Sequence, residues 1–196
     1  MKLLKFVVFS LLLSCNSNTE ALPILSYKIN NLGAQENYTI TYENFTNQLD
    51  TKFTTASIKD KVFISNFFFT RCPSICPPMR SELIDIAQHF ENYSDFLIIS
   101  HTIDPEFDST LVLKNYAEAT GITHQKWQFI RASETQTKQQ AKQFMTNFRP
   151  YEDGTDYYHS SYITLVDQKK HIRGFYNSSI PKEVERLKKD IKILLN

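Results

Sequence analysis

The segment that most constrains the fold of this chain joins an apolar run to a pair of cysteines. Val62–Phe69 is almost continuously apolar, which is typical of a strand buried on both faces of a sheet. Cys72-Pro73-Ser74-Ile75-Cys76-Pro77 follows, and Pro77–Tyr93 then carries apolar side chains at helical spacing. The two thiols are therefore predicted at a strand-to-helix turn, where a helix N-terminus stabilises thiolates. Thiolates at such a turn attack disulfides or bind soft metals.

The segments around this turn alternate between strand and helix patterns. Strands are predicted at Tyr38–Glu43, Phe96–Ile103, Trp127–Ile130, Tyr162–Asp167 and Ile172–Tyr176. Helices are predicted at Ser109–Thr120, from a cap at Ser133 or Thr135 to about Phe148, and from Pro181 onward. Asn47–Asp50 is typical of a turn from which Lys52–Thr54 pairs back as a hairpin, and Arg149–Tyr158 is typical of a loop.

This order predicts an α/β fold with a partly parallel sheet and helices on both faces. A cysteine pair between a central strand and its following helix, with a terminal β-β-α unit, indicates a thioredoxin-like three-layer fold. We expect a central mixed sheet flanked by helices, with an N-terminal β-hairpin extension. The 196 residues, 41% of them hydrophobic, suit one domain. The net charge of +1 gives no field that would recruit nucleic acid.

The N-terminus has the form of a signal peptide. Lys2 and Lys5 precede an apolar segment, Phe6–Leu13, that is too short to span a bilayer. The following Leu12-Leu13-Ser14-Cys15 resembles a bacterial lipobox, in which the peptide is cleaved before a cysteine that carries a diacylglycerol. We therefore expect a lipoprotein of the bacterial cell envelope, anchored to a membrane and facing the periplasm. The alternative is a plain secretory signal with an incidental cysteine.

These assignments divide the chain into three parts and simplify its cysteine count. Residues 1–14 are the predicted signal peptide, 15–37 the lipid-anchored tether and extended segment, and 38–196 the thioredoxin-like domain. The chain has three cysteines. If Cys15 carries lipid, Cys72 and Cys76 remain, and no structural disulfide framework is left. Outside the cytoplasm, such a thiol pair has to be kept reduced by a partner or held by a metal.

The spacing of the pair and one histidine favour a metal site. Cys72 and Cys76 have three residues between them, and thioredoxin-type enzymes have two. Two thiols four positions apart lie near the upper edge of the Cα separation of about 4.4–6.8 Å that a disulfide requires. His159 lies in the loop before the terminal hairpin. In thioredoxin-like folds this loop contacts the cysteine turn. Two thiolates and one imidazole suit Cu(I), or Cu(II) with an added oxygen, whereas Zn(II) normally takes four ligands. The alternative for His159 is a hydrogen-bonded structural histidine.

Three separate motifs resemble those of the SCO/SenC family. Asn66-Phe67-Phe68-Phe69-Thr70-Arg71-Cys72-Pro73-Ser74-Ile75-Cys76-Pro77 resembles its copper-site motif. Ile103-Asp104-Pro105-Glu106-Phe107-Asp108 resembles its Val-Asp-Pro-Glu segment, and Asp156-Tyr157-Tyr158-His159-Ser160 resembles its histidine motif. The resemblance extends over roughly Tyr38–Leu195. Two departures are His101-Thr102, where the family has small or aliphatic residues, and the Gln168-Lys169-Lys170 turn.

The resemblance implies a thioredoxin-like fold that binds one copper ion through Cys72, Cys76 and His159. It also implies a role in delivering copper to the CuA centre of cytochrome c oxidase, or in reducing the thiols of that centre. Asp104 matches an acidic family position, with an expected outer-shell role in orientation or electrostatics. The alternative for Asp104 is a turn residue before Pro105, and Asp108 is typical of a turn or helix start.

Three functions stay open on the sequence alone. The first is a metallochaperone, which is not an enzyme, whose partners are an oxidase subunit carrying CuA or another copper protein. The second is a thiol-disulfide oxidoreductase of the envelope, in which Cys72 and Cys76 are catalytic and an envelope thiol reductant is the partner. The third is a copper or redox sensor. None of the three uses nucleic acid.

Overall fold

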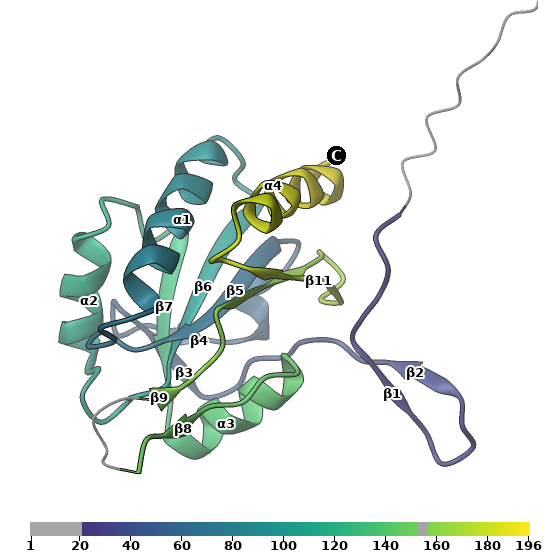
Figure 1. Cartoon of the computed structure of the whole chain (residues 1–196), viewed down its shortest axis with the longest axis horizontal. Helices are drawn as coiled ribbons and strands as arrows, with labels where there is room; N and C mark the ends of the chain where they lie inside the picture. Colours follow the sequence, from purple (N-terminus) through teal and green to yellow (C-terminus); the bar gives the residue numbers. More distant parts are fainter. Residues whose placement is uncertain (1–20, 153–156) are drawn as a thin grey trace, which may run out of the picture.

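A seven-stranded mixed sheet forms the centre of the structure (Figure 1), a computed structural model that describes residues 21–152 and 157–196. The strands lie in the order β11-β10-β5-β6-β7-β3-β4. Their bounds are β3 Phe45–Asn47, β4 Lys52–Phe53, β5 Val62–Phe68, β6 Phe96–Thr102, β7 Trp127–Arg131, β10 Tyr162–Val166 and β11 Ile172–Asn177. β5, β6 and β7 are parallel, whereas β10 runs antiparallel to β5 and β3 antiparallel to β7. The predicted mixed sheet is confirmed.

Helices cover both faces of this sheet. They are α1 Cys76–His89, α2 Thr110–Glu118, α3 Glu134–Gln143 and α4 Pro181–Leu195, with a short 3-10 helix at Thr55–Ile58. Phe68 contacts Tyr116 of α2, whereas its neighbour Phe67 contacts Phe144, which follows α3. Successive side chains of a strand point to opposite faces, so α2 and the end of α3 lie on different faces. The predicted three layers are confirmed.

The two central strands bring the cysteine turn to one edge of the sheet. Every residue of β5 and of β6 is buried, as the apolar runs predicted. The two strands pair in parallel from Val62 opposite Phe96 to Phe68 opposite Thr102. Their carboxyl ends therefore lie side by side, and the segments that leave them, residues 69–75 and 103–109, are neighbours.

The predicted strand at Tyr38–Glu43 is wrong. This segment is irregular, and β3 begins only at Phe45, after Asn44 in the left-handed conformation with φ 59°. Ile40 and Tyr42 are buried by packing on the core, which gives the same alternation of apolar residues as a strand. The turn and the hairpin are confirmed, because Phe45 pairs with Phe53, but this hairpin forms the edge of the main sheet.

A second hairpin, nearer the N-terminus, forms the extension outside the main sheet. β1 (Tyr27–Ile29) and β2 (Gln35–Asn37) form a separate two-stranded sheet, shown in purple on the right of Figure 1. All six strand residues are exposed, so no apolar alternation marks these strands in the sequence.

Two further boundaries differ from the sequence prediction. α3 ends at Gln143 rather than near Phe148, because Met145 takes a left-handed conformation with φ 54°. The predicted loop before the last hairpin contains a short ladder between β8 (Arg149–Pro150) and β9 (Tyr157–Tyr158).

The signal peptide and Cys15 lie outside the described residues. Among residues 21–152 and 157–196, no helix has the length and apolarity needed to cross a bilayer.

Candidate metal centre

The two cysteines lie where the sequence predicted, between β5 and α1. The Cys72 amide donates to the Phe69 carbonyl at 3.2 Å, which closes a turn directly after the strand. Cys76 is the first residue of α1, and Pro77 follows it. Pro77 and Pro78 lack backbone N–H groups. These positions in the first turn of α1 therefore add no backbone donor that would need a partner. Both cysteines are buried, with 7% of Cys72 and 4% of Cys76 exposed.

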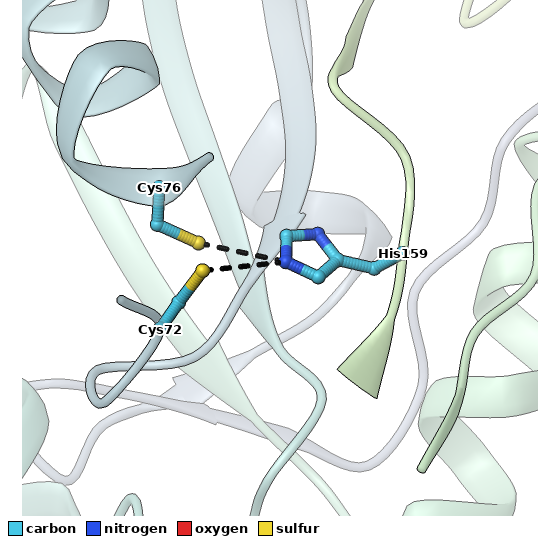
Figure 2. Close-up of side chains that lie close together, drawn as sticks. All are labelled: Cys72, Cys76 and His159. Atoms are coloured by element: carbon cyan, nitrogen blue, oxygen red, sulfur yellow. Dashed lines mark hydrogen bonds between the residues drawn. The ribbon is translucent and has the colours of Figure 1, made fainter. Parts of the chain in front are cut away.

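His159 completes a group of three potential metal ligands. Its Nε2 atom lies 3.6 Å from Sγ of Cys72 and 3.7 Å from Sγ of Cys76. The three ligand atoms all lie within 4.8 Å of one another. Figure 2 shows both sulfur atoms directed at the same nitrogen, the cysteines from the turn and α1, the histidine from the segment before β10. The sequence predicted that these residues meet, and the structure brings them together.

An aromatic pair holds the imidazole in place. The rings of Phe69 and His159 pack edge to face, with centroids 5.6 Å apart and an interplanar angle of 77°. Phe69 is itself buried and contacts Tyr157, two residues before the histidine, at a centroid distance of 5.1 Å. Edge-to-face packing fixes ring orientation. Phe69 therefore orients His159 toward the sulfur atoms.

The donor set is chemically soft. Thiolates and an imidazole are ligands for Cu(I) and Zn(II), whereas Mg²⁺ and Ca²⁺ take oxygen. Among the residues that the structure describes, this is the one cluster of three or more histidine, cysteine or acidic side chains with metal-binding geometry. Three donors suit a three-coordinate soft ion better than structural Zn(II), which takes four.

Asp104 lies beside this group and is not a member of it. Its carboxylate accepts a hydrogen bond from the guanidinium of Arg71 at 2.7 Å, and only 5% of Asp104 is exposed. Arg71 precedes Cys72 and also lies over the ring of Phe107, 4.0 Å from its centroid. The structure therefore links Asp104 to the cysteine turn through Arg71. Its outer-shell role stays a prediction.

Asp108 has a structural role that the sequence did not indicate. Its carboxylate is fully buried and accepts hydrogen bonds from the amide and hydroxyl of Thr70 and from the hydroxyl of Thr102. Burial raises the pKa of Asp108, and the hydrogen bonds from Thr102 and Thr70 oppose that rise. Because Thr70 precedes the cysteines and Thr102 ends β6, Asp108 fastens the cysteine turn to the neighbouring strand.

His101 is a core residue. It is completely buried and stacks between Phe67, with ring centroids 4.6 Å apart, and Tyr42, at 5.5 Å. Its Nδ1 atom lies 3.2 Å from the carbonyl oxygen of Asn66. Burial lowers the pKa of His101 to about 3, so the imidazole is neutral at neutral pH. Its aromatic surroundings fit a buried, uncharged ring at this position.

Comparisons with known proteins agree on one family. The family model for SCO1/SenC matches residues 33–196. The SCO1 protein homolog of Bacillus subtilis is 29% identical over 72% of this chain and 75% of its own length. The SCO2-like protein of Rickettsia felis is 31% identical over 67% of this chain and 66% of its own length.

Solved structures share the fold. The crystal structure of a SCO1/SenC family lipoprotein from Bacillus anthracis matches with a TM-score of 0.75 and 25% identity, over 90% of this chain and all of that one. The structure of BsSco, described as a member of the Sco family of cytochrome c oxidase assembly proteins, matches with a TM-score of 0.70 and 26% identity, over 81% and 94% of the two chains. With a family model that matches residues 33–196 and a curated relative that is 31% identical over 67% of the chain, this chain belongs to the SCO1/SenC family.

Proposed function

We propose that this protein is a copper chaperone that serves the assembly of cytochrome c oxidase. The observation that carries the proposal is the convergence of two cysteine sulfurs and one histidine nitrogen within 4.8 Å. Cys72, Cys76 and His159 would hold one copper ion, which is the cargo of the protein. Support comes from family membership and from BsSco, which is described as belonging to a family of cytochrome c oxidase assembly proteins.

The geometry suits a carrier that both holds and releases its ion. The two sulfurs are buried and positioned by a turn and a helix start, so they need little rearrangement to bind. Binding requires both thiols to lose their protons and the imidazole to be neutral. His159 is only partly buried, and it approaches from a different segment than the cysteines. A ligand of the acceptor can therefore replace the imidazole first, while the two thiolates retain the ion.

A thiol reductant of the same copper-site partner is the second candidate function. It is favoured by the closeness of the two thiols and by BsSco, whose structure is described in terms of a disulfide switch. In this reaction Cys72 and Cys76 form a disulfide and give up two electrons and two protons. A disulfide of the partner takes them up and becomes two thiols.

The proposed place of action is the cell envelope, with Cys15 carrying a lipid. The lipobox-like sequence is the basis of this proposal, and the Bacillus anthracis relative, described as a lipoprotein, supports it. Mass spectrometry of the mature N-terminus tests it. An unmodified Cys15, or cleavage elsewhere, would refute it.

An anaerobic Cu(I) titration with thiol counting tests the copper proposal. The wild type should bind one copper per chain against a chelator that competes for Cu(I), and His159→Ala should bind far more weakly with both thiols still reduced. His124→Ala, which changes an exposed histidine, is the matched control and should bind as the wild type does. Wild-type affinity in His159→Ala would refute the three-ligand site. The reductant candidate predicts that His159→Ala keeps reductase activity and that Cys72→Ala or Cys76→Ala abolishes it.

A further inference from the structure

The segment before the N-terminal hairpin is fastened to the last hairpin of the main sheet. The Leu25 amide donates to the carbonyl of Ile172 at 2.8 Å, and the Ile172 amide donates to the buried hydroxyl of Ser26 at 3.1 Å. The guanidinium of Arg173 donates to the carbonyl oxygens of Pro23 and Leu22. The chain therefore has a fixed point at residues 22–26.

The β1–β2 hairpin that follows stands away from the rest of the domain. It forms a sheet of its own, and Figure 1 shows it extending from the side of the molecule opposite α2. Its strand residues are all exposed. A two-stranded hairpin without a packing partner is marginally stable in water, so this one is expected to have a partner.

The tip of the hairpin is built to present a leucine. The side-chain oxygen of Asn30 accepts hydrogen bonds from the amides of Leu32 at 2.9 Å and Ala34 at 3.0 Å. The Gly33 amide donates to the Asn30 carbonyl at 3.0 Å, and Gly33 adopts φ 78°, which glycine takes without strain. Leu32 is 91% exposed. The amides of Leu32, Gly33 and Ala34 are thus satisfied within the tip, which lowers the cost of moving this turn out of bulk water.

The large exposed side chains of this hairpin are hydrophobic, and its tip carries no charged residue. Ile29 is 62% exposed and Tyr27 is 41% exposed, and with Leu32 they place three large side chains on one small element. No charged residue occurs from Ile29 to Gln35. An aliphatic tip with a tyrosine at its base matches the boundary between water and lipid, where tyrosine is enriched.

The length of chain before the fixed point limits its distance from a lipid anchor. Leu22 lies seven positions after Cys15, and at the maximum extension of about 3.6 Å per residue this stretch spans roughly 25 Å. A lipid on Cys15 therefore holds the fixed point within that distance of a membrane. From Tyr27 at the base of the hairpin to Leu32 at its tip the chain advances five positions, which adds about 17 Å of reach at about 3.3 Å per residue. We propose that the tip of the β1–β2 hairpin inserts Leu32 and Ile29 into the lipid surface that anchors the chain. This inference rests on the proposed lipidation of Cys15 and is independent of the copper proposal.

Tryptophan quenching in vesicles tests this contact. The mature lipidated protein is reconstituted into vesicles of phosphatidylethanolamine and phosphatidylglycerol, with and without brominated acyl chains. The test variant is Leu32→Trp and the matched control is Leu111→Trp, which replaces a leucine that is 65% exposed on α2. The native Trp127 is 2% exposed and supplies a background that the wild type measures. After subtraction, bromolipid should quench the indole of Leu32→Trp several-fold more strongly than that of Leu111→Trp.

Flotation of the vesicles separates the two proposals. If the protein floats with the vesicles and the two variants are quenched equally, the hairpin contact is refuted and the lipid anchor stands. If the protein does not float, the lipid anchor fails and the hairpin inference fails with it. A blue shift of the Leu32→Trp emission that grows with protein concentration in the absence of lipid would assign the tip to a second copy of the chain and would also refute the membrane contact.

Discussion

The Sγ atom of Cys72 lies 3.6 Å from Nε2 of His159, although the two residues are 87 positions apart in the chain. Sheet register explains this proximity. β10 pairs antiparallel with β5, with Thr164 opposite Ser65 and Val166 opposite Phe63, so paired residue numbers sum to 229. If this register is extended past the start of β10, position 159 lies opposite position 70. The histidine is therefore brought to the cysteine turn by the same pairing that builds the sheet.

Copper should stabilise the folded protein through this pairing of distant segments. A ligand present at 100 times its Kd, and bound only by the folded state, adds about 2.7 kcal/mol to the free energy of unfolding. For a chain of this size, each kcal/mol raises Tm by about 2–4 °C, so we expect a rise of roughly 5–10 °C. Differential scanning calorimetry under anaerobic conditions measures it. Cys72→Ser and Cys76→Ser are the controls and should show little rise, and an equal rise in them would contradict the site.

Phe69 should matter for copper binding beyond its contribution to stability. Phe69→Ala removes a buried ring that contacts His159, and truncation of a buried phenylalanine costs about 3–5 kcal/mol. Phe90→Ala is the matched control, because Phe90 is equally buried but lies at the opposite end of α1 from Cys76. We expect both variants to be destabilised in urea and only Phe69→Ala to bind Cu(I) more weakly in chelator competition. Equal affinities would show that the ring does not orient the imidazole.

Asp104 should tune the site through Arg71. Loss of an outer-shell partner typically lowers metal affinity by about 10- to 100-fold, and Asp104→Asn removes the charge that binds Arg71 while it keeps the shape of the side chain. We expect weaker copper binding at the lower end of this range, because Asp104 acts through a neighbour of Cys72. Chelator competition measures it, with the exposed neighbour Glu106→Gln as control. Unchanged affinity in Asp104→Asn would restrict Asp104 to a structural role.

The local pattern of the sequence was enough to place the cysteines, and a fold-level argument was needed to place the histidine. The apolar run and the helical spacing around Cys72 and Cys76 are properties of neighbouring residues, so both were predictable. The proximity of His159 followed only from the topology expected for the fold. Asp108 was not recognised as a support of the site because its partner Thr70 lies 38 residues away and the local sequence is also typical of a turn.

The errors at the N-terminus have a common physical cause. Apolar alternation reports which side chains are buried, and it does not report which backbone groups are paired. Ile40 and Tyr42 are buried without belonging to a strand, so they produced a false prediction. β1 and β2 are paired without being buried, so apolar alternation does not reveal them.

The early end of α3 has a different cause. It depends on Met145, a residue type that rarely takes positive φ.

The buried His101 should make the stability of the protein depend on pH. Its pKa is lowered by burial to about 3, whereas an unfolded chain has a histidine pKa of about 6.5. Between about pH 3 and pH 6.5 the unfolded state therefore binds more protons than the folded state, and the difference approaches one proton in the middle of that range. The free energy of unfolding should fall as pH decreases, with a slope approaching about 1.4 kcal/mol per pH unit from this residue alone.

Replacement of the imidazole isolates this contribution. His101→Phe keeps an aromatic ring between Phe67 and Tyr42 and cannot be protonated. Urea unfolding between about pH 4.5 and 6.5 should show a shallower pH dependence in His101→Phe than in the wild type. His124→Gln removes an exposed histidine and should leave the wild-type slope unchanged. The same slope in His101→Phe and the wild type would mean that other groups carry the acid sensitivity, and that His101 is protonated in the folded protein at a pKa near its ordinary value.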